Sequence, residues 1–218
     1  IFFSKAVYDR FKNRPEVYTQ FLERLKFNDY IGLQAFDEAR GRLPQPGTPE
    51  RNVSGHVSVT LPRMGYGYIL EVPPVHTLAF YNGVANGGRM VAPRLVDHIE
   101  RNGEVVETMP VVTLIDKMCS EQTIGVLREC LAAAATPERT AGHFKTLPVT
   151  FGCKTGTAQV WNNFQTICNK DIVSMKDGMT PAHDHYYLGS IVTMMPFEKP
   201  KYTVMVCVAK QQTETHPT

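Results

Sequence analysis

The sequence has little net charge, which argues against binding partners that are recognised mainly through charge. Its 23 lysines and arginines stand against 21 aspartates and glutamates, so the formal charge at pH 7 is +2, and no basic tract occurs. Proteins that bind nucleic acids or anionic membranes through charge carry a basic patch or run. We therefore expect no nucleic-acid partner and no binding to an anionic membrane surface.

Long apolar runs and metal-binding cysteine pairs are absent as well. No stretch reaches the apolar length of a membrane-spanning helix, and no signal peptide opens the sequence. The cysteines are odd in number and form no Cys-x-x-Cys pair: Cys119, Cys130, Cys153, Cys168 and Cys207. We expect all five to be buried as small hydrophobic residues, and we expect no metal and no cofactor.

The hydrophobic content predicts one domain with a substantial core. Hydrophobic residues make up 43% of the 218 residues, which fits a single domain over residues 1–218. A helix is expected to begin at Pro15, with an apolar stripe at Tyr18, Phe21, Leu22 and Leu25. A second should run from Pro74 to a glycine cap at 87–88, and a third from Ser120 to Pro137, with Ile124, Leu127 and Leu131 on one face.

Strand patterns dominate the second half of the sequence. Asn102-Gly103 predicts a hairpin within residues 91–106, and strands are expected at 149–161, 186–195 and 202–209. Both faces of the last strand are apolar, so we expect it to lie centrally in the sheet between helices. Residues 40–55 and 162–184 are expected to be loops. The predicted fold class is α/β (α+β), an antiparallel sheet flanked by helices.

The most informative motif is Lys154-Thr155-Gly156-Thr157, followed by Ala158. Lys154 supplies a fixed positive charge, and the hydroxyls of Thr155 and Thr157 can hold a substrate carboxylate. Gly156 removes the side chain where a substrate backbone would lie against the strand. Lys-Thr-Gly is one of the known motifs of serine acyl-transfer enzymes.

The residues around this motif resemble class B penicillin-binding proteins. Gly65-Tyr66-Gly67 leads into a proline-started helix that ends in Ala85-Asn86-Gly87-Gly88, and residues 136–141 stand where the family has a Gly-Thr-Ala segment. Residues 185–189 and the turn at 196–200 are similar to the last two strands of the family. The resemblance runs from near residue 1 to about residue 210 and is strongest to division-specific transpeptidases. It implies a penicillin-binding transpeptidase fold like that of serine β-lactamases.

Two family motifs are missing from the sequence. No serine is followed by lysine three residues later, and none by asparagine two residues later. Residues 1–5 resemble the helix that follows Ser-x-Asn in the family. We therefore expect a partial transpeptidase domain that is inactive by itself. The resemblance places the nucleophile and a membrane anchor outside it, and the domain at the periplasmic face of the inner membrane.

The resemblance also implies an activity and a site. It implies a D,D-transpeptidase that cross-links peptidoglycan stem peptides through a serine acyl-enzyme and is acylated by β-lactams. Lys154 and Thr157 would be catalytic, and Thr155, Gly156, Thr157 and Ala158 would bind substrate. Divisome membrane proteins, including a polytopic glycosyltransferase, would be partners. A carboxypeptidase or β-lactamase relative, and a non-catalytic β-lactam sensor or divisome scaffold, remain open.

Other candidate sites carry weaker signals. Cys153 precedes Lys154, but strand alternation turns it to the opposite face, so burial is expected rather than nucleophilic catalysis. His183-Asp184-His185 lacks a third ligand at a recognisable spacing, and a solvated strand entrance is expected there. Tyr66 and Tyr68 between glycines do not make a nucleotide-binding loop. We also expect the partial domain to self-associate through exposed apolar surface, or its first helix to loosen.

Overall fold

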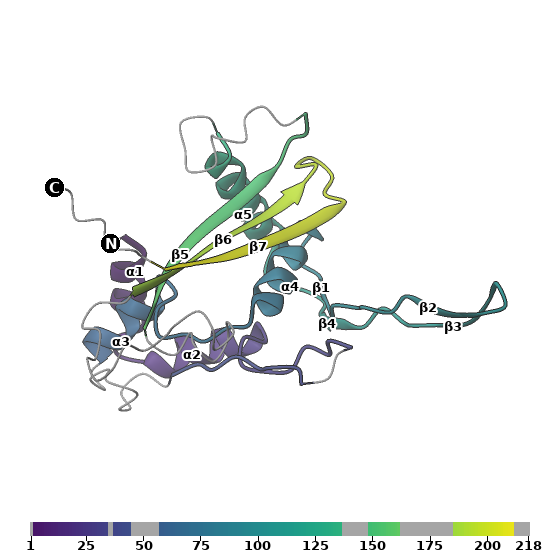
Figure 1. Ribbon diagram of the computed structural model, residues 1–218. Coiled ribbons are helices and arrows are strands. Elements are labelled where there is room, and N and C mark those ends of the chain that lie inside the picture. The colour runs from purple at the N-terminus through teal and green to yellow at the C-terminus, as the bar shows by residue number, and fades with distance from the viewer. Residues whose placement is uncertain (1, 35–36, 45–56, 137–147, 162–184, 212–218) are drawn as a thin grey trace. The chain divides into compact units, whose positions relative to one another are not determined.

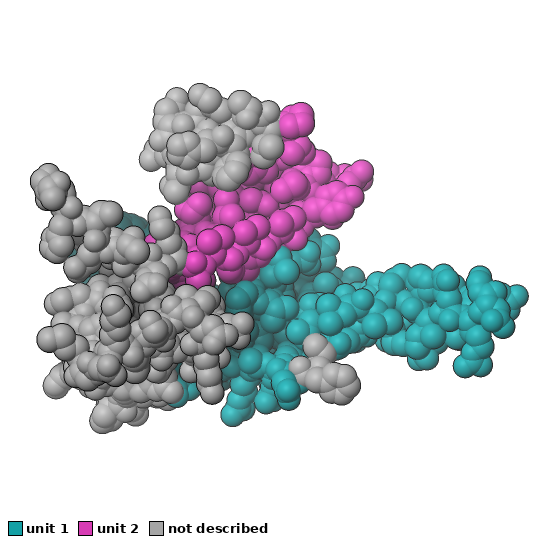
Figure 2. All heavy atoms as spheres, in the orientation of Figure 1, with its two compact units in different colours: residues 1–129 teal, residues 130–218 magenta. Residues whose placement is uncertain are grey.

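The computed structural model describes residues 2–34, 37–44, 57–136, 148–161 and 185–211 (Figure 1). The chain divides into two compact units, residues 1–129 and residues 130–218 (Figure 2). The elements are α1 Phe2–Phe11, α2 Pro15–Arg24, α3 Val57–Met64, α4 Pro74–Ala85, β1 Met90–Val91, β2 His98–Arg101, β3 Glu104–Thr108, β4 Thr113–Ile115, α5 Glu121–Ala134, β5 Gly152–Trp161, β6 His185–Met195 and β7 Tyr202–Gln211.

The first core of unit 1 forms around α2, which begins at Pro15 as the sequence predicts. Proline is favoured at the first helical position because its missing N–H has no intrahelical acceptor there. Leu22 is buried and packs in one cluster with Leu43 and Met64. Phe21 remains 41% exposed, so only part of the predicted stripe faces the core. Residues 41–44 are irregular as predicted, and residues 45–56 lie outside the described residues.

Backbone contacts hold the chain between α2 and α3. The Glu38 carboxylate accepts the backbone N–H groups of Ile31, Gly32 and Leu33 at 2.6, 3.1 and 3.1 Å. Arg42 N donates to the Glu71 carbonyl at 2.6 Å, and Glu71 N donates back at 3.0 Å. This carboxylate and this short bridge satisfy backbone groups that lie in no helix or regular strand.

Helix α4 confirms the predicted proline start and glycine end. Pro74 is its first residue, and it ends at Ala85. Gly87 and Gly88 follow with φ of 69° and 97°, and Gly88 N donates to the Gly83 carbonyl at 2.7 Å. Glycine adopts this left-handed backbone without the steric cost of a Cβ. The helix contributes Ala79 to a second core cluster, which also contains Ile31 and Met90.

The predicted hairpin is a two-stranded ribbon made of β2 and β3. Asn102 and Gly103 form its turn with φ of 54° and 83°, the left-handed pair expected of Asn-Gly. Every residue of both strands is exposed. Nearer the core, β1 pairs antiparallel with β4.

Helix α5 begins where Ser120 predicts. The N–H of Thr123 donates to Ser120 Oγ at 3.1 Å, so the serine caps the helix. Ile124 and Leu131 are buried, whereas Leu127 is exposed. The helix ends at Ala134, ahead of the predicted end at Pro137, which lies outside the described residues.

Unit 2 contains an antiparallel sheet in the order β5-β6-β7, with uninterrupted register across both pairs. All three predicted strands are confirmed, but the predicted central position of residues 202–209 is wrong. Within the described residues β6 is central, and β7 leaves Tyr202, Val204, Val206 and Val208 between 43% and 65% exposed. Apolar composition predicts that a strand will be buried, but it does not predict which strands lie beside it in the sheet. The predicted 162–184 loop lies outside the described residues.

The exposed face of β7 makes self-association an expected result. Alternate residues share a face, so the three valines of β7 form one apolar row. Sedimentation velocity should show concentration-dependent association that Val206→Lys weakens. Val126→Lys on α5 is the matched control, because Val126 is also an exposed valine (54%) but lies on a helix in unit 1 instead of on β7. A monomer at every concentration would contradict this expectation.

Candidate functional site

The Lys-Thr-Gly-Thr motif lies on β5, an outer strand of the described sheet. Its residues pair with β6 in continuous register, Lys154 with Val192 and Thr157 with Gly189. The opposite edge of β5 pairs with no strand in the described ranges. An open edge of this kind can receive an extended peptide as an added strand.

Strand alternation divides the motif between two faces. Lys154 and Gly156 lie on one face with Ala158, and Thr155 and Thr157 lie on the other. Lys154 and Thr157 are exposed, and Thr155 is half-buried. The structure thus places all five predicted site residues on one strand, but on both of its faces. A ligand along the open edge can meet side chains from either face.

The ammonium of Lys154 turns toward the backbone of its own strand. Lys154 Nζ donates to the carbonyl oxygen of Thr155. In an antiparallel strand the N–H and C=O of one residue point to the same side, and the side alternates along the chain. Thr155 and Thr157 therefore direct their backbone groups to the same edge of β5.

Gly156 has a close neighbour that the sequence did not suggest. Gly156 pairs with Ser190 of β6, and a Cβ built at Gly156 would lie 2.9 Å from Ser190 Oγ. The Ser190 hydroxyl lies beside the position where a side chain of residue 156 would begin, a proximity that only the register reveals. That Gly156 leaves room for a substrate backbone stays a prediction.

A double-mutant cycle tests this contact. Gly156→Ala should lower the free energy of unfolding by about 1 kcal/mol, because the new methyl group displaces the serine hydroxyl. In a Ser190→Ala background the same substitution should cost less, since the hydroxyl is gone. Urea unfolding of the four proteins measures the difference. An equal cost in both backgrounds would show that the hydroxyl does not limit residue 156.

Cys153 is buried, as predicted, on the face of β5 opposite to Lys154. Its exposed fraction is 1%, while the adjacent Lys154 is exposed. Burial raises the pKa of the Cys153 thiol, and the Lys154 ammonium opposes this shift. The thiol is therefore poorly suited to act as a nucleophile.

Alkylation should distinguish Cys153 from the other cysteines. The expectation that all five are buried is wrong for Cys130 and Cys207, which are exposed on α5 and β7; Cys119 is partly buried, and Cys168 lies outside the described residues. Iodoacetamide at pH 8 should modify Cys130 and Cys207 first, and Cys153 about a hundredfold more slowly until denaturant is added. Peptide mapping by mass spectrometry gives the rates. Equal labelling of the native protein would contradict the burial of Cys153.

The described ranges contain neither a metal-binding cluster nor a membrane-spanning helix. No group of three or more His, Cys, Asp or Glu side chains suited to a metal occurs there. His183 and Asp184 of the weak ligand candidate lie outside those ranges. None of the helices there combines the length and apolarity that a membrane crossing needs.

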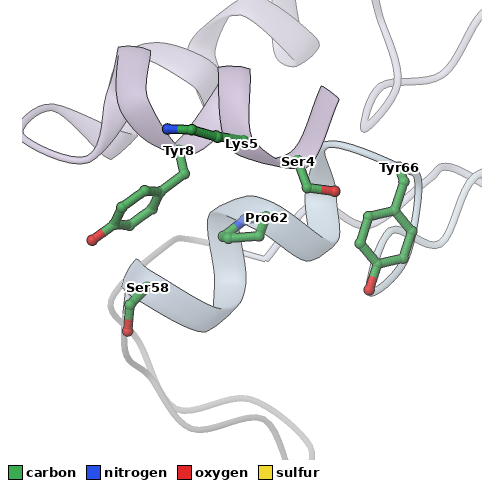
Figure 3. A pocket seen from close by; sticks show the side chains of 6 residues that line it. All are labelled: Ser4, Lys5, Tyr8, Ser58, Pro62 and Tyr66. Carbon is green, nitrogen blue, oxygen red and sulfur yellow. The ribbon is translucent and has the colours of Figure 1, made fainter. Parts of the chain in front are cut away.

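Unit 1 has a hollow of about 600 Å³ between α1 and α3 that sequence reasoning missed. Figure 3 shows its lining residues: Ser4, Lys5, Tyr8, Ser58, Pro62 and Tyr66. Lys5 donates to Asp9 at 2.5 Å, one helical turn along α1. Ser4 and Lys5 are adjacent in sequence and are not three residues apart, so the hollow does not contain a Ser-x-x-Lys motif.

Comparison with known proteins identifies the family. The penicillin-binding protein transpeptidase domain model matches residues 10–217. Penicillin-binding protein 2B of Streptococcus pneumoniae R6 is 18% identical, with a TM-score of 0.65 over 91% of this chain and 29% of its own. Penicillin-binding protein 3 of Mycobacterium tuberculosis is 19% identical, with a TM-score of 0.62 over 90% of this chain and 41% of its own. No curated protein matches the sequence.

A third solved structure gives the same result. The transpeptidase domain of penicillin-binding protein 3 from Burkholderia pseudomallei is 22% identical, with a TM-score of 0.56 over 89% of this chain and 49% of its own. The chain thus spans less than half the length of these three solved chains. The match confirms the predicted fold class, a mixed α/β structure with an antiparallel sheet. The chain belongs to the penicillin-binding protein transpeptidase domain family.

Proposed function

We propose that these residues form part of a division-type peptidoglycan D,D-transpeptidase that reacts through a serine acyl-enzyme and is acylated by β-lactams. The observation that carries the proposal is the Lys154–Thr157 motif on an outer strand, with Lys154 and Thr157 exposed beside an open edge. The family match supports it, and penicillin-binding protein 3 of M. tuberculosis has been solved with ampicillin. The proposal includes a location at the periplasmic face of the inner membrane and partners in the divisome, including a polytopic glycosyltransferase.

The proposed reaction has two acyl-transfer steps. A serine hydroxyl attacks the carbonyl carbon of the penultimate D-alanine, the bond to the terminal D-alanine breaks, and that residue leaves as an amine with the serine proton. The amine of a neighbouring stem peptide then attacks the ester, forms the cross-linking amide and returns a proton to the serine. The 218 residues contain no Ser-x-x-Lys, so polypeptide outside them supplies the serine and its base. We expect the 218 residues alone to be inactive.

The motif residues serve this reaction as charge and hydrogen-bond donors. The Thr155 and Thr157 hydroxyls hold the substrate carboxylate, and Lys154 supplies the positive field. The N–H of Thr157 is one donor to the oxyanion, while the backbone of Gly156 and Ala158 lies along the bound peptide. Removing one such oxyanion donor typically costs about 3 kcal/mol of transition-state stabilisation.

The first test is the intact mass of a longer protein, extended upstream in the parent gene, after treatment with benzylpenicillin. One stable adduct on an upstream serine is expected, and Ser→Ala at that position should remove it. No adduct on a folded extended protein would favour a non-catalytic scaffold. Incubation with a stem peptide and an amine acceptor then separates cross-linking from hydrolysis, because only a transpeptidase forms the new amide.

A further inference from the structure

A ribbon built on β2 and β3 exposes apolar side chains along its length. Figure 1 shows β2 and β3 extending away from β1 and β4 of the same unit. We call residues 94–112 the acidic ribbon. Its exposed apolar residues, each between 42% and 64% exposed, are Leu95, Val96, Ile99, Val105, Val106, Val111 and Val112. Two strands alone are marginally stable in water, so a ribbon that exposes this many apolar side chains gains from being covered by a partner.

The base of the acidic ribbon is braced by side-chain hydrogen bonds. Gln34 Oε1 accepts the N–H groups of Leu95 and Val96 at 3.0 and 2.8 Å. Arg94 donates to the Met109 carbonyl across the ribbon and forms an ion pair with Asp97 at 2.6 Å. These contacts hold the base of the ribbon, and a braced binding element loses less entropy when it binds.

The charge of the acidic ribbon differs in sign from that of the whole chain. It contains two arginines and four carboxylates, a net charge of −2, within a chain of net charge +2. Asp97 is paired with Arg94, and Glu100 lies 2.9 Å from His98 Nε2. Glu104 and Glu107 of β3 take part in neither of these pairs. Among the described residues they form no ion pair within 4.0 Å.

The register of the ribbon determines which side chains of β3 lie on each of its two faces. Glu107 pairs with Ile99, and Glu104 pairs with Arg101. The register shifts between Ile99 and Glu100, which leaves Val106 as an extra residue on β3. Cross-strand partners share a face, and Ile99 and Arg101 are two residues apart on β2. Glu104 and Glu107 therefore lie on one face although they are three residues apart on β3. Val105 pairs with Glu100 and lies on the opposite face. The outer edge of β3 thus offers carboxylates on one face and an apolar side chain on the other.

We propose that the outer edge of β3 binds an extended segment of a partner protein in which lysine or arginine alternates with apolar residues. The segment adds as a third strand, with its basic side chains on the face of Glu104 and Glu107 and its apolar side chains on the face of Val105. A second copy of the acidic ribbon would set carboxylates against carboxylates, and an anionic lipid surface would be repelled. The inference does not rest on the proposed transpeptidase function.

A designed peptide tests the site. A fluorescein-labelled peptide of four lysines alternating with three valines should bind the 218-residue protein in fluorescence anisotropy. Glu104→Lys/Glu107→Lys should weaken its binding by about tenfold or more, because two attractive contacts become repulsive. Val105→Ser should also weaken peptide binding, because it removes the apolar side chain that the valines of the peptide contact. A peptide with glutamate in place of lysine should not bind.

A charge-matched variant supplies the control. Glu121→Lys/Glu129→Lys makes the same change in net charge at exposed positions of α5, and binding should stay at the wild-type level. Circular dichroism confirms that each variant is folded. Absence of binding to the wild-type protein overturns the proposal. Equal weakening in the α5 variant also overturns it, because general charge attraction would then explain the binding.

Discussion

Replacing Lys154 with alanine should slow acylation by benzylpenicillin about a hundredfold in the extended, catalytically complete protein. The ammonium is exposed on β5, and in our proposal it provides the positive field for the substrate carboxylate. The expected loss is comparable with that of one oxyanion-hole donor. The rate is measured from the growth of the adduct mass with time. Stability should change little, because an exposed lysine side chain contributes little to the core.

Two variants make this result specific. Lys201→Ala removes another exposed lysine of unit 2, just before β7, and should leave the acylation rate unchanged. Lys154→Arg keeps the positive charge on a side chain of different shape, so this variant should be acylated faster than the Lys154→Ala variant. If the Lys154→Ala protein is acylated at the wild-type rate, Lys154 does not contribute to the acylation site.

Gly41→Ala is expected to be the most destabilising of the glycine-to-alanine substitutions in unit 1. A Cβ at this position would lie 1.9 Å from the Phe27 carbonyl oxygen and 2.8 Å from the Glu71 carbonyl oxygen. Both atoms belong to the backbone, and the second accepts the N–H of Arg42, so neither moves easily. We expect a loss of about 3 kcal/mol or more, the upper range for overpacking. Thermal and urea unfolding measure it.

The opposite result is expected for a glycine in open space. Gly125 lies within α5, and nothing is within 4 Å of a Cβ placed there. Gly125→Ala should therefore raise stability by about 0.5–1 kcal/mol, because alanine loses less backbone entropy in a helix. If the two substitutions had equal effects, the close backbone approach at Gly41 would not exist in solution.

Local signals predicted most of the elements. Pro15 and Pro74 start helices, Ser120 caps one, and the turn at Asn102-Gly103 reverses the ribbon. Each depends on the stereochemistry of one or two residues and their immediate neighbours, so the sequence is sufficient. The burial of Cys153 behind Lys154 followed in the same way from strand alternation.

Contacts between distant residues were not predictable from those signals. Nothing in the sequence links Ser190 to Gly156, Glu38 to the amides of residues 31–33, or Gly41 to the Phe27 carbonyl. The same limit explains the error at β7, because an apolar strand does not specify its neighbours. It also explains the exposed Cys130 and Cys207, since cysteine is buried only where the fold provides a core position.

The sequence by itself determined the family, the secondary structure around its caps and turns, and the strand that carries Lys154, Thr155, Gly156, Thr157 and Ala158. Those features depend on residue type and short spacing. Only the tertiary structure decided the strand order β5-β6-β7, the edge of β5 that pairs with no described strand, and the Ser190 hydroxyl beside Gly156. The physical reason is that register and packing join residues far apart in the chain, and a residue's own preferences do not encode which distant partner it meets.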